Sequence, residues 1–233
     1  MNRTNENKEI GLTFYTSKSL RDWSTGRKIL SVLIGYDQDL ASEFVELDHG
    51  LQRIKVCDYD DLSYSWTNSL VFILHRKSTY RSQTSISLVK NKSGYHLFSM
   101  WIEADYFQNK FNVERFKAFG KKLYETIEPD YGFIHEIESS LEMATIVDPV
   151  YGKTIIPVNL AKGIPGIYWG NFFSEKFSES INIEKIKMIQ GVLVEKLSPN
   201  GVFIQIGNSL VEPDKEFYTI SQLVSNYFGN LLA

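Results

Sequence analysis

Residues 69–103 read SLVFILHRKSTYRSQTSISLVKNKSGYHLFSMWIE, and this stretch contains three runs of strand-forming residues separated by polar turns. The runs are Ser69–His75, Thr84–Val89 and Tyr95–Glu103, each containing β-branched or aromatic side chains. Between the second and third runs, Asn91–Gly94 ends in a glycine, which can take the positive φ that many hairpin turns need. The stretch therefore predicts an antiparallel meander of strands.

A helix is predicted directly after the meander, because apolar residues recur there at helical spacing. The recurring residues fall on one helical face: Val113, Phe116, Phe119, Leu123 and Ile127. Asn112 is the predicted N-cap, since asparagine accepts hydrogen bonds from the first free N–H groups of a helix. Pro129 ends the pattern, and the residues on the apolar face are predicted core.

The chain ahead of the meander predicts a strand, a helix and a second strand. Ile10–Thr16 is rich in strand-forming residues. Ser24–Tyr36 has near-helical spacing of apolar residues, but a strand is the alternative for Ile29–Ile34 because so short a run does not fix its period. Leu51–Val56 alternates between apolar and charged residues and predicts a half-buried strand.

The second half of the chain predicts shorter elements. Tyr131–Ile137 reads as a strand, whereas residues 139–166 carry several prolines and glycines and predict a long loop with one strand or short helix inside it. The expected elements that follow are a buried strand within Gly166–Phe173, a helix at Ser174–Ser180, a short helix at Ile183–Ile189, a hairpin of Val192–Leu197 and Val202–Ile206, and a closing helix at Phe217–Phe228.

These elements predict an α+β fold with a largely antiparallel sheet and packed helices, because strands outnumber helices and do not form regular βαβ repeats. A single domain over residues 1–233 is expected, with a boundary near residues 105–112 as the alternative division. Leu123–Ile137 and Leu193–Ile206 both run from an apolar element through a Pro- and Gly-containing turn into a strand-like run. This echo raises a weak internal duplication as an alternative origin of the second half.

Composition narrows the class of protein. The 233 residues are 43% hydrophobic and 23% charged, which is typical of globular proteins and excludes disorder and fibrous architectures. A formal net charge of −3 argues against general nucleic-acid binding, which favours a strongly basic face. Cys57 is the single cysteine, so neither an internal disulfide nor a cysteine-rich zinc site is expected.

The sequence also predicts the cellular compartment of the protein. The first nine residues are polar and lack the apolar core of a secretory signal. No apolar run approaches the roughly 20 residues that span a bilayer. We therefore expect a cytoplasmic protein with no membrane association, and a lone reduced thiol suits that compartment.

The sequence contains only weak matches to the motifs of catalytic or metal sites. His135-Glu136-Ile137-Glu138 has no second histidine for a helical zinc motif, and on a strand its side chains divide between two faces. We therefore interpret it as a histidine at the core edge beside two solvated carboxylates. Asp58-Tyr-Asp-Asp61 lacks the length, internal glycine and final glutamate of an EF-hand loop. The expectation is no enzyme and no cofactor, with a metal-dependent hydrolase built on His135, Glu136, Asp58 and Asp61 as an alternative.

Charge is distributed unevenly along the chain. Residues 37–61 hold eight acids and two bases, and residues 125–148 hold seven acids and no base. Residues 71–92 hold five bases and no acid. Such runs are either solvated faces or an acidic surface for a basic partner, and complementary charge would speed association with that partner.

At Gly166-Ile-Tyr-Trp-Gly-Asn-Phe-Phe173, followed by the predicted short helix, the chain resembles the carboxy-terminal half of bacterial toxin-immunity proteins. It is similar to the immunity protein 52 family and its type VI secretion-associated relatives. The early Gly11–Tyr15 strand, Pro129–Gly132 and Gly201–Gly207 agree with that pattern. Gly170–Asn171 departs from it, because the family often has Leu-Thr or a similar pair there.

The resemblance implies a non-enzymatic α+β protein that binds one cognate toxin, encoded by an adjacent gene, and blocks its active site. It also implies a nuclease-type toxin, whose basic groove an acidic patch would occupy. The predicted partner-binding residues are acidic or aromatic: Asp58, Tyr59, Asp60, Asp61, Glu136, Glu138 and Glu142. Trp169 is predicted to be core rather than a contact residue. An interaction module without a toxin partner is the other alternative.

Overall fold

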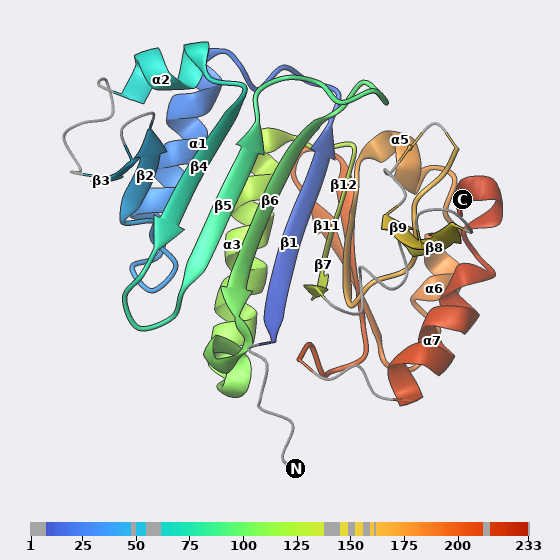
Figure 1. Cartoon of the computed structure of the whole chain (residues 1–233). Helices are drawn as coiled ribbons and strands as arrows, with labels where there is room; N and C mark the ends of the chain where they lie inside the picture. The colour runs from blue at the N-terminus through green and yellow to red at the C-terminus, as the bar shows by residue number, and fades with distance from the viewer. Residues whose placement is uncertain are drawn as a thin grey trace.

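An antiparallel sheet of ten strands runs through the computed structural model, which describes residues 8–47, 50–54, 62–137, 145–148, 152–155, 159–160, 162–211 and 215–232. The strands are β1 (Glu9–Thr16), β2 (Phe44–Leu47), β3 (Gly50–Arg53), β4 (Val71–Arg76), β5 (Ser82–Ser87), β6 (His96–Glu103), β7 (Tyr131–Glu136), β10 (Gly170–Phe173), β11 (Val192–Leu197) and β12 (Gly201–Ile206). Their order is β11-β12-β10-β7-β1-β6-β5-β4-β2-β3, and all neighbours are antiparallel (Figure 1). Two further strands, β8 (Thr145–Asp148) and β9 (Gly152–Ile155), pair with each other.

Helices cover the two faces of this sheet unequally. The helices are α1 (Trp23–Gly35), α2 (Leu62–Asn68), α3 (Lys110–Ile127), α5 (Glu175–Ser178), α6 (Ile183–Ile186) and α7 (Lys215–Ser225), with 3₁₀ turns at Ala104–Gln108 and Gly229–Leu231. The long helices α1 and α3 lie together on one face, behind the strands in Figure 1. This arrangement of a mainly antiparallel sheet with packed helices confirms the predicted α+β fold class.

The core lies between α3 and the middle of the sheet. Leu12, Ile134 and Phe172, from β1, β7 and β10, are fully buried. They surround Gly120 of α3, where an added Cβ would lie 3.2 Å from the ring of Phe172. The absent side chain lets the helix approach the sheet closely. On the same helix, the predicted core residues Phe116, Phe119 and Leu123 are also fully buried, which confirms that prediction.

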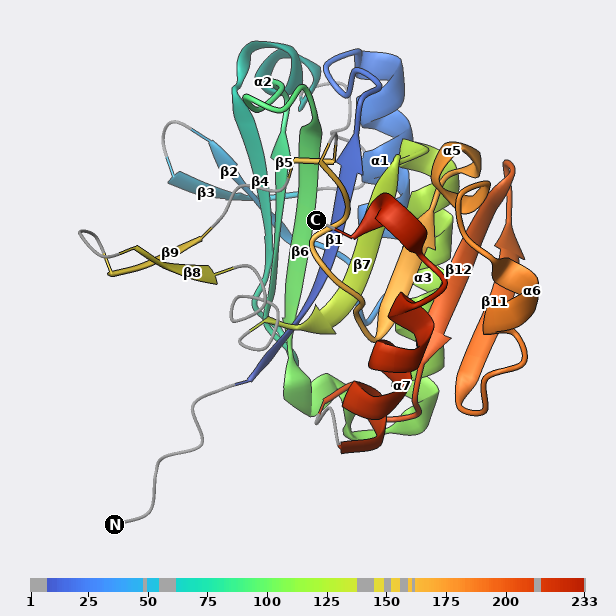
Figure 2. The ribbon, with the colours of Figure 1, turned by 90° about the vertical axis from the view of Figure 1, so that its right-hand side faces the viewer.

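The second face is covered only over one half of the sheet. There, the ring of Phe217 from α7 lies 5.2 Å from that of His135 in β7, and Tyr168 stacks on Phe133 at 4.0 Å between centroids. Figure 2 shows α7 on this side of β7 and β12. Trp169, in the same covering segment, is 1% exposed, so the prediction that it belongs to the core is confirmed.

Asn171, at the position where the chain departs from the family pattern, is fully buried in β10. Its side-chain Oδ1 accepts a hydrogen bond from the N–H of Tyr168 at 2.9 Å, and its Nδ2 donates to the carbonyl of Tyr168 at 2.6 Å. Buried polar side chains persist where such partners satisfy them. Asn171 therefore fixes the bend that leads the covering segment into β10.

Two helix predictions need adjustment. Residues 29–34 lie in α1, so the strand alternative for that run is wrong; the helix begins after Asp22, whose carboxylate accepts the N–H of Thr25 at 3.2 Å. The N-cap of α3 is Asn109, which accepts the N–H of Phe111 at 2.9 Å. The predicted cap, Asn112, instead donates from its side chain to the carbonyl of Tyr106 at 2.7 Å.

The strand predicted at Leu51–Val56 is shorter and more exposed than expected. It is β3, which ends at Arg53 and lies at the edge of the sheet, and Leu51 is 43% exposed. The two echoing segments both lead into buried strands, β7 and β12, but the first comes from helix α3 and the second from strand β11. Among the described residues, no helix is both long and apolar enough to cross a membrane.

Candidate functional site

Strands β4, β5 and β6 alternate regularly between buried and partly exposed side chains. The buried set includes Leu74, Ile86 and Phe98. It faces the side of α3, because the ring of Phe98 lies 6.0 Å from that of Phe14, which in turn lies 5.1 Å from the ring of Phe172 beside Gly120. The partly exposed set points to the opposite side, where Figures 1 and 2 show no helix over these strands. Antiparallel sheets with one packed and one uncovered face give this alternation. The uncovered side is hereafter the open face.

The register places the residues of the open face in three rows across the sheet, and the third row contains Leu97. We define this face by eight partly exposed residues: Thr13, Ile73, His75, Gln83, Ser85, Leu97, Ser99 and Trp101. Trp101 lies opposite Gln83, and Gln83 lies opposite His75. In the next row, Ser99 lies between Thr13 and Ser85, and Ser85 lies opposite Ile73. The open face thus sets small hydroxyl side chains beside a row that carries the large indole of Trp101.

Charge is confined to the border of the open face. None of its eight residues is Asp, Glu, Lys or Arg. At one border, Glu103 pairs with Arg81, and at the other, His75 Nε2 lies 3.0 Å from Glu46 Oε2. A charge-poor centre with an aromatic side chain and a polar rim is characteristic of protein-binding surfaces. The open face therefore has the chemistry of a docking surface for another protein.

Most of the predicted partner-binding residues cannot be placed. Asp58, Tyr59, Asp60, Asp61, Glu138 and Glu142 lie outside the described residues, so their role stays a prediction. Glu136 is described, at the end of β7, and its side chain is 7% exposed with an oxygen 3.7 Å from Nζ of Lys8. The interpretation of Glu136 as a solvated carboxylate is therefore wrong, because β7 lies inside the sheet and Glu136 is paired with Ile10 of β1.

The described acids of residues 37–47 and 125–137 form ion pairs and hydrogen bonds with other parts of the fold. Asp37 and Asp39 both bind Arg115 of α3, and their hydrogen bonds, with that of Asp39 the larger effect, raise the pKa of this guanidinium. The remaining described acids with internal partners form pairs or hydrogen bonds: Glu43 with the N–H groups of Lys77 and Ser78, Glu46 with His75, Glu125 with Lys122, Glu128 with Lys18, and Asp130 with the N–H of Ser17. Over these described residues, the acidic runs are therefore engaged in interactions within the fold and do not form a patch of unpaired carboxylates.

His135 lies in β7 with its ring among aromatic neighbours. It is 1% exposed, and its Nδ1 accepts the backbone N–H of Trp169 at 3.2 Å. Nε2 is buried and has no hydrogen-bond partner among the described residues. Desolvation by burial lowers the pKa of His135 to about 4, so the ring is neutral at physiological pH. His135 is thus a core residue, as predicted, and it is more deeply buried than the predicted position at the core edge.

This burial predicts a specific loss of stability in acid. Between about pH 6.5 and pH 4, the unfolded chain protonates His135 and the folded chain does not, so the free energy of unfolding falls as pH is lowered through this window. The shift corresponds to about 3 kcal/mol. Denaturant titrations of the protein and of His135→Gln, which retains an acceptor, measure the difference. The wild-type protein should lose about 3 kcal/mol more than the variant between these pH values, and parallel pH profiles would contradict the assignment.

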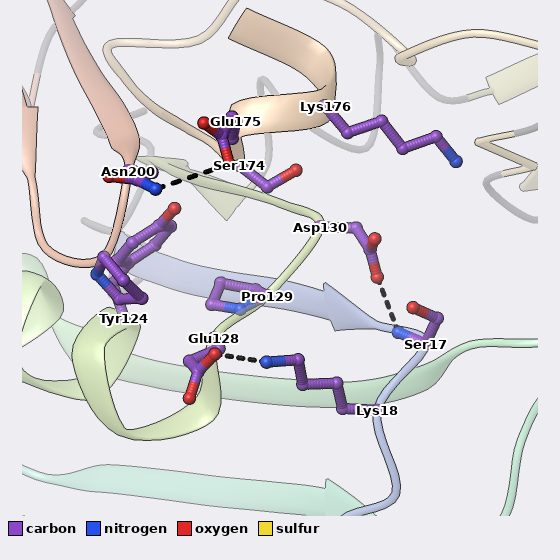
Figure 3. A pocket seen from close by; sticks show the side chains of 11 residues that line it. Ser17, Lys18, Tyr124, Glu128, Pro129, Asp130, Ser174, Glu175, Lys176 and Asn200 are labelled. Atoms are coloured by element: carbon purple, nitrogen blue, oxygen red, sulfur yellow. Dashed lines mark hydrogen bonds and ion pairs between the residues drawn. The ribbon is translucent and has the colours of Figure 1, made fainter.

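A recess lies where several chain segments meet at one end of the sheet (Figure 3). It has a volume of about 310 Å³. Its lining comes from the end of β1, the end of α3, the start of α5 and the β11–β12 turn: Ser17, Lys18, Tyr124, Glu128, Pro129, Asp130, Ser174, Glu175, Lys176, Pro199 and Asn200. Tyr124 donates to the carbonyl of Phe173 at 3.2 Å, and burial raises its pKa to about 12. The recess joins parts of the chain more than 100 residues apart.

The part of the chain that the structure describes contains no cluster of side chains that could hold a metal ion. No three His, Cys, Asp or Glu side chains gather there as a metal ion would need. His135 and Glu136 are neighbours on one strand whose side chains point to opposite faces, as the alternation predicts. The other two residues of the hydrolase alternative, Asp58 and Asp61, lie outside the described ranges.

Neither the open face nor the recess was identified from the sequence alone. The signal for the open face was the alternation in Ser82–Ser87 and His96–Glu103, but alternation does not show which strands are neighbours or which half of a face is covered. The recess left no local signal, because its lining is assembled from four separate segments.

Comparison with known proteins gives a fold relationship. No protein-family model and no curated protein matches the sequence, so the resemblance to the immunity protein 52 family stays a prediction. Among solved structures, the chain is similar to one described as the Pseudomonas aeruginosa T6SS protein PA0821, with a TM-score of 0.64 and 11% sequence identity. The match covers 97% of this chain and 76% of that one. At this identity, the two proteins share a fold over almost the whole chain.

Proposed function

We propose that this protein is a cytoplasmic immunity protein that binds a cognate bacterial toxin and occludes its active site. The observation that carries the proposal is the open face, half of one side of a large sheet that no described helix covers. Sheet faces are usually buried against another layer of the fold. An uncovered face with few charges and a partly exposed tryptophan is suited to a layer supplied by another protein.

The open face is large enough to form the centre of an interface. Four strands, β1, β6, β5 and β4, lie beneath it and are about 4.8 Å apart, and their paired segments of about six residues extend about 20 Å. This area, about 20 Å by 20 Å, is about half of the roughly 800 Å² that each protein buries in a standard interface, so a stable complex would also have to cover the charged rim and its surroundings. Such an interface requires no catalytic group from this chain.

Two further observations support a toxin as the partner. The Gly166–Phe173 segment resembles type VI secretion-associated immunity proteins, and a protein with the same fold is described as a T6SS protein. Rim acids such as Glu46 would face the basic groove of a nuclease-type toxin.

Co-expression with the product of the adjacent gene tests the proposal. The neighbouring product alone should stop growth, and this protein should restore growth and co-purify with it in a one-to-one complex. A matched control is a catalytically inactive form of the neighbouring product, which should still form the complex. A harmless neighbour, or the absence of both rescue and binding, would leave only an interaction module and overturn the toxin assignment.

A further inference from the structure

Strand β11 forms one edge of the ten-stranded sheet, and no described strand lies on its outer side. The N–H and C=O groups of an exposed edge lack partners, so proteins usually protect an edge with charges, proline or a bulge. β11 reads Val-Leu-Val-Glu-Lys-Leu and pairs with β12 in a regular register without a bulge. Its acid, Glu195, is neutralised by Lys121 of α3, whose Nζ lies 2.5 Å from the carboxylate. Apart from Lys196 near its end, the edge therefore lacks these protections.

The hydrogen bonds to β12 show which backbone groups of β11 point outward. The N–H of Gly207 donates to the carbonyl of Gly191 at 2.8 Å, directly before the first pair of the ladder. In an antiparallel ladder, hydrogen-bonded and non-hydrogen-bonded pairs alternate, and residues of the second kind direct their N–H and C=O groups away from the neighbouring strand. The odd-numbered residues of β11 therefore bond to β12. The residues with outward backbone groups are Val192, Val194 and Lys196.

The free part of this edge is its second half. The N–H of Val192 donates to the carbonyl of Ile189 at 3.2 Å, so a local turn occupies the outer side at that point. The outward groups of Val194 and Lys196 have no partner among the described residues. Alternate residues of a strand lie about 7 Å apart, and another extended backbone offers donors and acceptors at this spacing. The chemistry of the free edge therefore fits an extended chain.

A second recess, here called the edge recess, adjoins the free half of the edge. It has a volume of about 360 Å³ and is lined by α5, the start of α6 and the β11–β12 turn. Its apolar lining is Ile183, Leu197 and Val202, and Lys196 contributes to its wall. Helix α6 contacts β11 and lies on the side of the sheet that carries α7 (Figure 2). Cross-strand partners share a face, so the residue of an added strand that lies opposite Lys196 would point into the edge recess.

We infer that the edge of β11 binds an extended segment of the toxin, which adds a strand to the sheet and places an aliphatic side chain in the edge recess. Strand addition combines main-chain hydrogen bonds for affinity with a side-chain pocket for specificity. The volume of the edge recess lies near the lower limit of small-molecule pockets, so it suits a side chain better than a cofactor. This inference rests on the proposed function for the source of the segment. The segment would be a second contact, because the open face lies over β1, β6, β5 and β4.

A second copy of this chain fits the edge less well than an extended segment. Antiparallel pairing of two β11 strands about Val194 would meet the turn between Ile189 and Val192. Pairing about Glu195 would set two carboxylates directly opposite each other, which is destabilising.

The test uses a synthetic peptide of alternating valine and threonine with a lysine at each end, and it follows backbone amide signals of the intact protein by NMR. Saturable shifts and slowed hydrogen exchange are expected at Val194 and Lys196, with a dissociation constant in the millimolar range. The amide of Leu193, which bonds to β12, should keep its exchange rate. The same peptide with every backbone amide methylated cannot donate hydrogen bonds and should bind at least about 10-fold more weakly.

Two variants test the edge and the edge recess separately. Val194→Pro removes an outward N–H and leaves the bonds to β12 in place, whereas Ile183→Lys puts a charge at the edge recess without altering the strand. Each should weaken peptide binding at least about 10-fold. Leu223→Lys is the matched control, because Leu223 is 48% exposed on α7 and does not line the edge recess. Equal binding of the methylated peptide, or unaffected binding by either variant, would overturn the site.

Hydrogen exchange in the toxin complex tests the source of the segment. With an inactive form of the neighbouring product bound, the amides of Val194 and Lys196 should exchange at least about 10-fold more slowly than in the free protein. Unchanged exchange would overturn the toxin as the source. Protection that grows with the concentration of the free protein would assign the edge to a second copy and would also overturn it. The peptide titration contains no toxin, so its result stands whether or not the growth rescue succeeds.

Discussion

Ser99→Arg is expected to abolish protection against the toxin while the protein remains folded. Ser99 lies in the middle row of the open face, between Thr13 and Ser85. An arginine there extends from the uncovered side in the free protein, where such substitutions cost little stability. In the complex, it places an unpaired charge at the centre of the interface, which costs about 3–5 kcal/mol. Calorimetric titration should show the affinity for the toxin falling at least about 100-fold.

Ser31→Arg provides the matched control, since Ser31 is exposed on α1, on the other side of the sheet. This variant should bind and protect like the wild-type protein. Circular dichroism and thermal melting of both variants separate a binding defect from unfolding. If Ser99→Arg is folded and binds the toxin with wild-type affinity, the open face is not the docking surface.

Gly132→Ala is expected to cause a large loss of stability, although it adds only one methyl group. Gly132 lies in β7 opposite Phe14 of β1, and an added Cβ would be 2.1 Å from Cδ1 of Phe14. It would also be 2.7 Å from the backbone oxygen of Thr13, which the β1–β7 ladder holds in place. Overpacking of a core costs about 1–3 kcal/mol, and contact with the backbone places this variant at about 3 kcal/mol or more.

Thermal unfolding monitored by circular dichroism checks this prediction. A loss of about 3 kcal/mol lowers the melting temperature by about 6–12 °C in a domain of this size. Gly35→Ala is the control, because Gly35 is the last residue of α1 and has no atom within 4 Å of an added Cβ. That variant should be neutral or slightly stabilising, since alanine favours helix. Equal melting temperatures for the two variants would contradict the packing around Phe14.

Local patterns in the sequence predicted the elements well. The recurrence of Phe116, Phe119 and Leu123 identified α3, and Asn91–Gly94 identified a turn in which Gly94 has φ of +87°. One prediction that failed, the N-cap of α3, was a choice between two nearby asparagines. Asn109 and Asn112 are equally good caps in isolation, and the structure uses Asn112 to bind the carbonyl of Tyr106. Tertiary contacts decide such cases.

The candidate site was harder to predict, because it depends on which strands are neighbours. β1 lies between β6 and β7, which are 80 or more residues away in the chain, and no local pattern encodes that order. The acidic runs were misleading for a related reason. Asp37 and Asp39 form a cluster in sequence, but the fold brings Arg115 of α3 to them. Charge counted along the chain does not distinguish a binding patch from an internal ion pair.

Oxidative footprinting of the protein, alone and mixed with the product of the adjacent gene, tests the central claim most directly. Trp101 is partly exposed on the open face, whereas Phe111 and Met188 are exposed elsewhere, at 66% and 80%. We predict that the toxin reduces oxidation of Trp101 strongly and leaves Phe111 and Met188 labelled as in the free protein. Labelling of Trp101 at the same rate in the mixture as in the free protein would contradict the account.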